Sequence, residues 1–335
     1  MNMPSFSNVL PSNRPSNRFG PTGFTLVEIL VVILIIAIMA SLITAVIGNS
    51  LNSARSAATR ATITKVHRLL EERRQAIARS NLRTETRVVR RSMTATPPIT
   101  GLNNNATAKV VAIKETMRAQ LPQQLDDLSG PDPRFNTGDE PPVLAQLKKI
   151  NSSFSGNSPS FPSSHIDTTT SSELLYVALT MGTELGSGGT TIEFNSREAV
   201  DTDGDGLMEL VDGWGKPLRF YRWPTDLVPG PGATPNANAR VDMLIGGGNA
   251  QLWNKDPDDP VGHFKKWINQ NPQVTHYFHA PSRYHVPLVV SAGRDGVLGL
   301  NEPHTTIGYF AKPATTDITL LSDSITNRNI SIGGN

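Results

Sequence analysis

An uncharged apolar run near the amino terminus constrains the fold of this chain more than any other feature. It covers residues 29–47 (ILVVILIIAIMASLITAVI), in which Ser41 and Thr44 are the only polar residues. A helix of that length is close to the ~30 Å thickness of the hydrocarbon layer of a bilayer. A cleaved secretory signal has a shorter apolar run of ~7–15 residues. The run therefore favours a membrane helix over such a signal.

One carboxylate, Glu28, lies at the edge of this run. A charge near the centre of a bilayer costs up to about 3 kcal/mol, so a residue of this kind usually has a partner or a function. The simpler alternative is a side chain that only extends toward the lipid head groups. On the apolar run alone, a plain signal anchor also remains an alternative.

The residues around Glu28 narrow these alternatives. Gly23-Phe24-Thr25-Leu26-Val27-Glu28, followed by the apolar run, resembles the cleavage and methylation signal of type IV prepilins and type II secretion pseudopilins. The resemblance covers about residues 20–50. It implies a leader at 1–23, and a membrane prepilin peptidase/N-methyltransferase that cuts between Gly23 and Phe24 and methylates the new amino group. It also implies a single-pass protein of the bacterial inner membrane whose head lies on the periplasmic side.

A physical reason for Glu28 follows from that cleavage. The new amino group of Phe24 is cationic and lies where water is scarce, so the Glu28 carboxylate of a neighbouring subunit can neutralise it. Loss of either charge would leave the other without its partner. We therefore expect Glu28 to set the register of one subunit against the next during assembly.

Beyond the apolar run the sequence becomes amphipathic, with apolar residues at helical spacing between basic ones and no Pro or Gly over 51–81. This pattern predicts a single transmembrane and amphipathic helix over 24–80. The predicted fold is α+β: this helix packs on a small antiparallel sheet, as in pilins. We expect a loop-rich, irregular insertion over 81–170, with one helix near 108–128, and a pseudopilin-like head over 171–335. Strands are predicted at 216–223, 241–245 and 286–291.

Charge is distributed unevenly along the mature chain. Residues 24–93 hold 11 Lys/Arg and 4 Asp/Glu, whereas residues 94–335 hold 18 and 25. Eight arginines lie between Arg68 and Arg91 without an aromatic residue among them. Stacking on bases normally needs aromatic side chains, so no nucleic-acid partner is expected, and a solvated or subunit-facing helix surface is the preferred interpretation.

An acidic segment at 201–212 carries the most specific chemical pattern of the remaining chain. DTDGDGLMELVD follows the calcium-loop pattern D-x-[DN]-x-[DN]-G-x5-E, except that its last position is Asp instead of Glu. Cysteine is absent, so another clamp would have to replace a disulfide. We expect calcium as a structural cofactor, although a solvated turn rich in Asp and Gly is the alternative. The expected ligands are Asp201, Asp203, Asp205, the Leu207 carbonyl, Glu209 and Asp212.

Two short segments extend the resemblance into the head. Asp212-Gly213-Trp214-Gly215-Lys216-Pro217-Leu218 resembles the turn before a strand in the major pseudopilin of type II secretion, although that family usually has Pro where Gly213 stands. Val289 to Gly299 (VVSAGRDGVLG) resembles a loop of the same family. In that family this loop belongs to a calcium site, which implies Ser291 and Asp295 as further metal ligands.

Enzymatic activity is not expected, because the chain has no nucleophile elbow, phosphate loop or dinucleotide fingerprint. A zinc site built from His276, His279 and His285, with Asp256, Asp258 and Asp259 nearby in sequence, is an alternative.

The sequence therefore predicts a structural subunit of a type II secretion pseudopilus or a type IV pilus-like filament. Its expected partners are the prepilin peptidase, copies of itself or other pseudopilins, the inner-membrane assembly platform, and membrane lipid before assembly. Two alternatives remain open: a minor or tip pilin that recognises a partner, and a carbohydrate-binding or hydrolytic head tethered by the same anchor.

Overall fold

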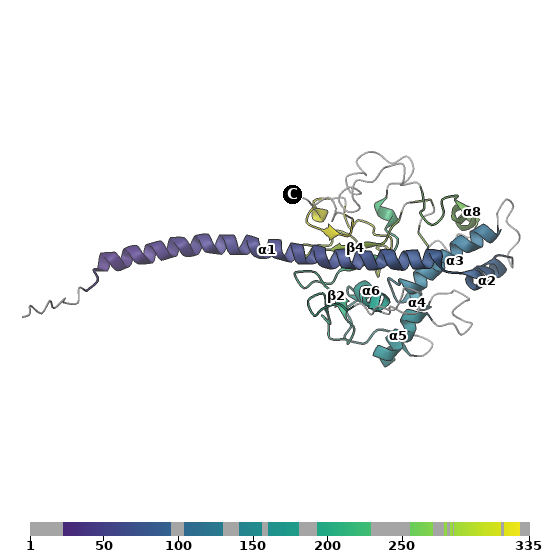
Figure 1. The fold of residues 1–335 in the computed structure, drawn as a ribbon, viewed down its shortest axis with the longest axis horizontal. Helices are drawn as coiled ribbons and strands as arrows, with labels where there is room; N and C mark the ends of the chain where they lie inside the picture. Colours follow the sequence, from purple (N-terminus) through teal and green to yellow (C-terminus); the bar gives the residue numbers. More distant parts are fainter. Residues whose placement is uncertain are drawn as a thin grey trace, which may run out of the picture. The chain divides into compact units, whose positions relative to one another are not determined.

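The computed structural model (Figure 1) consists of two compact units, residues 1–51 and residues 52–335. We call the second the larger unit. The structure describes residues 23–94, 104–129, 141–155, 160–180, 193–228, 255–270, 278–279, 282–283, 285–315 and 318–328. The expected leader at 1–23, apart from Gly23, and the expected strand at 241–245 lie outside these ranges.

The helix α1 (Leu26–Arg79) runs over nearly the whole segment for which a helix was expected. In the smaller unit its large apolar side chains from Leu26 to Leu42 are between 45% and 80% exposed. Among the described residues, no helix combines the length and the apolar character needed to cross a membrane. The expected transmembrane span at 29–47 is therefore not confirmed, and the side chains of 43–47 lie outside the described part.

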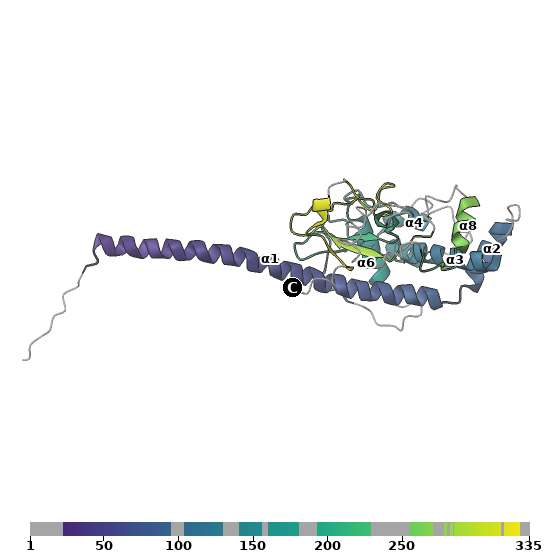
Figure 2. The ribbon, with the colours of Figure 1, turned by 90° about the horizontal axis from the view of Figure 1, so that it is seen from above.

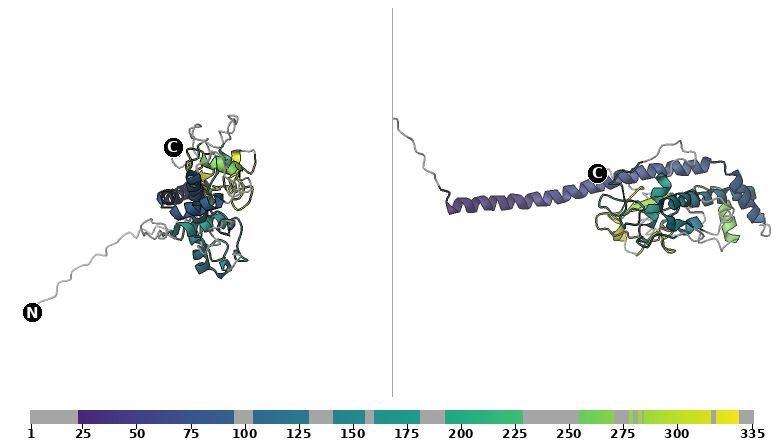
Figure 3. Two further views of the ribbon diagram at one scale, coloured as in Figure 1. Left: turned by 90° about the vertical axis from the view of Figure 1, so that its right-hand side faces the viewer. Right: turned by 90° about the horizontal axis from the view of Figure 1, so that it is seen from below.

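In the larger unit α1 buries one face. Its buried residues recur every three or four positions, as the amphipathic pattern predicts, and they are Thr59, Thr62, Ile63, Val66, Leu69, Leu70, Arg73 and Ile77. Arg73 also donates a hydrogen bond of 2.8 Å to the carbonyl of Ala178. Figures 2 and 3 show the elements of the larger unit on one side of this part of α1.

The region for which an irregular insertion was expected is mainly helical where the structure describes it. It contains α2 (Arg83–Thr94), α3 (Asn104–Gln120), the single turn α4 (Asp126–Ser129) and α5 (Pro142–Ile150), followed by the 3-10 helix η2 (Ser152–Phe154). The helix predicted near 108–128 is present as α3, but it ends at Gln120, and the expectation of a single helix in this region is wrong. Pro and Gly in this region end short helices instead of excluding them.

Two small antiparallel sheets confirm the predicted mixture of helix and sheet. The strands β1 (Ala199–Val200) and β2 (Glu209–Leu210) pair with each other. A second sheet has the order β3 (Arg219–Tyr221), β4 (Leu288–Ser291) and β5 (Ile325–Thr326). The strands β3 and β4 lie within the predicted runs 216–223 and 286–291, whereas β1, β2 and β5 were not predicted.

One hydrophobic cluster joins α1 to this sheet. Ile63 and Val66 of α1, α6 (Thr170–Thr180), Phe220 of β3 and Val289 of β4 all contribute buried side chains to it. A second cluster joins α3 to Trp223 and to Phe264 of α8 (His263–Gln270). Trp214 packs against the first cluster and Trp267 against the second. The three tryptophans in the described ranges thus belong to the core, whereas Trp253 lies outside them.

A buried ion-pair network connects α3 and α4 to the sheet. Asp127 accepts hydrogen bonds from Arg118 at 3.1 Å and from Arg222 at 2.9 Å, and Tyr309 donates to it at 2.5 Å. Burial opposes ionisation of Asp127, but the charge of Arg222 and then that of Arg118 outweigh it and lower its pKa to about 2. A buried carboxylate is stable here because the chain supplies its own cations.

Candidate functional site

The residues of the expected processing site lie just ahead of α1. Gly23, Phe24 and Thr25 precede the helix, and Phe24 is 79% exposed. The hydroxyl and the backbone N–H of Thr25 both donate to Glu28 Oε2 at 3.0 Å, and the Glu28 N–H donates to the Thr25 hydroxyl at 3.2 Å. This reciprocal pattern is a capping box. In this structure Glu28 therefore stabilises the start of its own helix, a role that the sequence interpretation missed.

The acidic segment brings most of its expected ligands together. One carboxylate oxygen of each of four residues lies within 4.8 Å of the others, and these residues are Asp201, Asp203, Asp205 and Glu209. Glu209 is buried at the start of β2, and its Oε1 has no hydrogen-bond partner within the described residues. Four carboxylates that converge in this way can supply the oxygen ligands that calcium prefers.

Backbone hydrogen bonds hold this loop in shape. Asp201 accepts from the N–H groups of Gly204 at 2.7 Å and of Gly206 at 3.0 Å. Both glycines have positive φ, +78° and +91°, which residues with a Cβ rarely adopt. The Leu207 N–H donates to Asp205 at 2.7 Å, and the Leu207 side chain joins the first hydrophobic cluster. The glycines of the motif thus fold the chain back so that its carboxylates converge.

Two residues that the sequence interpretation missed complete the group. Glu173 of α6 and His165 form a second set with Asp203 and Asp205, whose ligand atoms also lie within 4.8 Å of one another. His165 Nδ1 is 3.1 Å from Asp205 Oδ2 and 3.3 Å from Glu173 Oε1. We call Asp201, Asp203, Asp205, Glu209, Glu173 and His165 the carboxylate cluster. The sequence signal that could have indicated Glu173 is an acidic residue in the first turn of the apolar helix α6, where it is fully buried.

Burial changes the protonation of the carboxylate cluster. It raises the pKa of Glu209 to about 7, and the charges of Glu173 and Asp203 add to that rise. Burial also raises the pKa of Glu173. For His165 burial acts in the opposite direction, but Glu173 and Asp205 outweigh it and raise its pKa. Within the described residues one imidazole faces these five carboxylates, so a bound cation would relieve a strong repulsion.

Asp212 does not join the carboxylate cluster, contrary to its expected role as a ligand. Its Oδ1 accepts hydrogen bonds from the N–H groups of Trp214 at 2.9 Å and Lys216 at 3.0 Å. Its Oδ2 accepts a hydrogen bond of 2.6 Å from Ser291. Ser291 lies at the end of β4 and was also an expected metal ligand. Both residues fasten the turn before β3 to the sheet.

Gly213 stands in this turn where the similar family usually has Pro. A Cβ atom here would lie 2.3 Å from the carbonyl oxygen of Arg55 in α1, and the Gly213 N–H donates to Thr59 at 2.9 Å. Proline has neither the space nor the N–H that this contact requires. The departure from the family pattern therefore has a physical reason.

Asp295 is exposed and lies in a loop that contacts Asp323. Its carboxylate accepts from the Val297 N–H at 2.8 Å, and its own N–H donates to Asp323 at 3.1 Å. It belongs to no group of three or more potential metal ligands in the described ranges. The two expected ligands Ser291 and Asp295 are thus not brought to the carboxylate cluster.

The residues considered for zinc also meet, but around a lysine. Ligand atoms of Asp256, His279 and His285 lie within 4.8 Å of one another, and His276 lies outside the described ranges. The Lys114 Nζ of α3 is 2.8 Å from Asp256 Oδ2, 2.7 Å from His279 Nε2 and 3.3 Å from His285 Nε2. We call these four residues the lysine cluster. Its ammonium group takes the position that a metal ion would need.

The comparison with protein families gives one match. Residues 21–44 match the prokaryotic N-terminal methylation motif, the signal of type IV prepilins and pseudopilins. The resemblance inferred from the sequence is thereby confirmed for this segment, and the motif implies processing by a prepilin peptidase and assembly with other pilins. No curated protein and no solved structure is similar enough to the chain to match.

Proposed function

We propose that this chain is a structural subunit of a filament, either a type II secretion pseudopilus or a type IV pilus-like filament. The methylation motif at 21–44 is the observation that carries this proposal. Cleavage between Gly23 and Phe24 would leave a mature chain that begins directly ahead of α1. The chain would then be held in the bacterial inner membrane by a single pass, with its head on the periplasmic side.

The apolar surface of α1 supports assembly. Large apolar side chains from Leu26 to Leu42 are exposed all round the helix, and an exposed apolar surface of this extent marks contact with lipid or with other proteins. In a filament core such helices exchange lipid contacts for contacts with one another. The Phe24 amino group of one subunit and Glu28 of the next would set their register.

The proposed role is structural and not enzymatic. The partners would be the prepilin peptidase, an inner-membrane assembly platform and further copies of this chain or related pseudopilins. Calcium would act as a structural clamp in the carboxylate cluster, whose convergent and unneutralised oxygens support this role. A cysteine-free chain gains from such a clamp because no disulfide limits its unfolded state.

An assembly assay in a host that has a prepilin peptidase tests the proposal. Glu28→Ala removes the carboxylate that would pair with the neighbouring amine, so we expect normal cleavage and loss of sheared filaments in electron micrographs. Glu28 also caps its own helix, and Thr25→Val serves as the matched control because it removes that hydroxyl contact and keeps the carboxylate. Filaments at parental levels with Glu28→Ala, or equal loss with Thr25→Val, would contradict the proposed pairing.

The same assay separates a filament subunit from a head that only uses the helix as a tether. A tethered protein needs an intact anchor but no ordered contact between helices. Such a protein would remain in the membrane fraction and keep the activity of its head with Glu28→Ala. Accumulation of processed but unassembled chain is the result expected for a filament subunit.

A further inference from the structure

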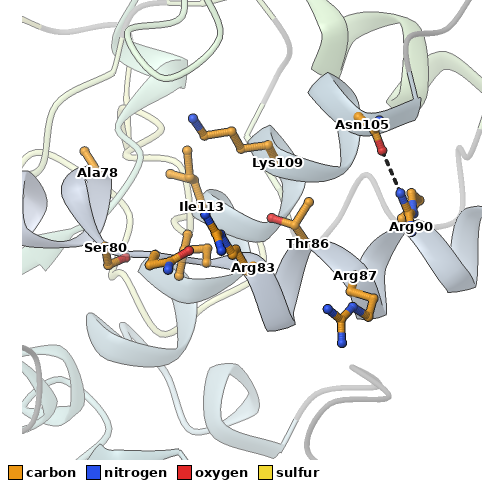
Figure 4. Close-up of a pocket in the computed structure, with 11 residues that line it drawn as sticks. Ala78, Ser80, Arg83, Thr86, Arg87, Arg90, Asn105, Lys109 and Ile113 are labelled. Carbon is orange, nitrogen blue, oxygen red and sulfur yellow. Dashed lines mark hydrogen bonds between the residues drawn. The ribbon is translucent and has the colours of Figure 1, made fainter.

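A basic pocket lies in the larger unit where the end of α1, α2 and α3 meet (Figure 4). Its volume is about 510 Å³, within the ~300–1,000 Å³ range of ligand pockets. Four of its lining side chains are cationic, and none of its lining residues is acidic; the cations are Arg83, Arg87, Arg90 and Lys109. This composition selects for a negatively charged ligand.

The cations of the pocket come from two helices that pack against each other. Arg83, Arg87 and Arg90 are spaced by four and three residues along α2, so they share one face of that helix. Lys109 extends from the neighbouring α3. All four side chains are exposed. The arginine face of α2, for which the sequence predicted a solvated or subunit-facing surface, thus forms one wall of a pocket.

Partners within the described residues do not neutralise this charge. Arg90 donates to Asn105 Oδ1 at 3.0 Å, a neutral acceptor. Neither Arg83, Arg87 nor Lys109 forms a side-chain hydrogen bond or an ion pair with any residue that the structure describes. Glu85, in the first turn of α2, does not line the pocket. Crowded like charges repel each other unless a counter-charge binds.

The backbone groups and the uncharged side chains that line the pocket also suit an anionic ligand. Arg83 is the first residue of α2, and Asn105 is the second residue of α3, so two helices begin at the pocket. The amino-terminal end of a helix carries a partial positive charge. Ser80 and Thr86 add hydroxyl groups, and Ile113 adds an apolar surface. Such a lining suits a compact molecule with more than one anionic group.

We propose that this pocket binds a compact ligand that carries two or more phosphate groups. Guanidinium groups offer paired N–H donors that match the oxygen atoms of phosphate, and a lysine adds a point charge. Phosphate groups on a small carbon skeleton can reach both Lys109 and the arginine face of α2 within the volume of the pocket. This binding is independent of filament assembly and of calcium.

Fructose 1,6-bisphosphate is a suitable probe, with isothermal titration calorimetry of the full chain in detergent at 50 mM salt. We expect one site per chain. Arg83→Gln with Arg87→Gln should weaken binding at least about tenfold, because charge-assisted hydrogen bonds are lost. Both residues are exposed, and an unchanged melting temperature shows that the variant is folded.

A control variant and a control ligand accompany the binding measurement. Arg68→Gln removes an arginine of α1 that is 72% exposed, pairs with Glu72 and does not line the pocket, so it should leave the affinity unchanged. The dicarboxylate adipate should bind more weakly than the bisphosphate. Absence of bisphosphate binding, equal weakening by Arg68→Gln, or adipate binding as tight as that of the bisphosphate would overturn the proposal.

Discussion

The carboxylate cluster and the lysine cluster contain similar residue types but differ in the source of their positive charge. In the lysine cluster the ammonium group of Lys114, which is fully buried, lies 2.8 Å from Asp256. In the carboxylate cluster the only basic side chain is His165, whose Nδ1 contacts Asp205 and Glu173, and Glu209 has a buried oxygen without a hydrogen-bond partner among the described residues. The lysine cluster contains its own cation, whereas the carboxylate cluster is where we propose that a cation binds from outside.

This difference shows that ligand-like residues alone do not define a metal site. Two histidines and an aspartate with converging atoms are typical zinc ligands, but a lysine from another element already lies among them. The carboxylate cluster contains more carboxylates than the chain neutralises. A third cluster, Asp127 with Arg118 and Arg222, resembles the lysine cluster because its cations are also internal.

The largest expected effect is that of removing the internal cation. Lys114→Ala leaves Asp256 buried without its ammonium partner, so the free energy of unfolding should fall by about 3–5 kcal/mol in urea titrations. Calcium should not restore this loss. The control Lys109→Ala changes an exposed lysine of the same helix and should cost less than about 0.5 kcal/mol. Equal losses of unfolding free energy in the two variants would show that Lys114 does not stabilise the fold as an internal cation, and the contrast between the two clusters would then fail.

The next effect concerns the cation supplied from outside. With a Kd of about 10 μM, within the range of calcium loops, 1 mM calcium stabilises the fold by about 2.7 kcal/mol. The melting temperature should therefore rise by several degrees. Asp203→Asn with Asp205→Asn should abolish the rise, whereas Asp167→Asn, an exposed neighbour, should keep it. A parent chain that melts at the same temperature with and without calcium would exclude the clamp.

The two clusters should also respond to pH in opposite directions. Without calcium, the pKa of Glu209 is raised from 4.5 to about 7, so its contribution to stability is present below pH 4.5 and is lost as pH rises through 7. Lowering the pH from 7 to 5 should then stabilise this cluster by about 2 kcal/mol. Glu209→Gln, which does not titrate, should remove the share of Glu209 from that gain in calcium-free urea titrations, whereas the raised pKa values of Glu173 and His165 should keep a smaller gain.

In the lysine cluster, burial and the charges of Lys114 and His285 lower the pKa of His279 to about 3. The neutral ring therefore contributes stability above pH 6.5, which is lost as pH falls toward 3. Between pH 7 and 5 the expected loss is about 2 kcal/mol, and His279→Gln should remove it. A gain in this cluster on acidification would contradict the assignment of an internal cation.

The smallest effect tests which expected ligands lie outside the carboxylate cluster. Ser291→Ala removes the hydrogen bond to Asp212 and should cost about 1 kcal/mol. The rise in melting temperature with calcium should stay as in the parent chain. A smaller rise in melting temperature with calcium in this variant would indicate that Ser291 is a metal ligand after all.

Local patterns predicted the elements that depend on nearby residues. The helix α1, the strands β3 and β4 and the convergence of Asp201, Asp203 and Asp205 all follow from periodicity or motif spacing. The other helices of region 81–170, apart from α3, were missed because Pro and Gly were interpreted as signs of loops, although short helices between them bury apolar faces.

Residues that complete the clusters could not be predicted because they come from distant parts of the chain. Lys114 and His279 are 165 positions apart, and His165 and Asp205 are 40 apart. Their proximity depends on how α3 and α6 pack, which no local pattern contains. Asp212 was placed with the calcium loop by spacing alone, but the turn at Gly213 and the hydrogen bond from Ser291 draw it to the sheet.

The most direct test of the central claim is the mass of the mature chain after expression with a prepilin peptidase. We expect a chain that lacks residues 1–23 and carries one methyl group on the amino nitrogen of Phe24. We expect the full-length mass when the peptidase is absent. A chain that keeps Met1 in the presence of active peptidase, or one cut after Ser41 or Ala45, would contradict the account.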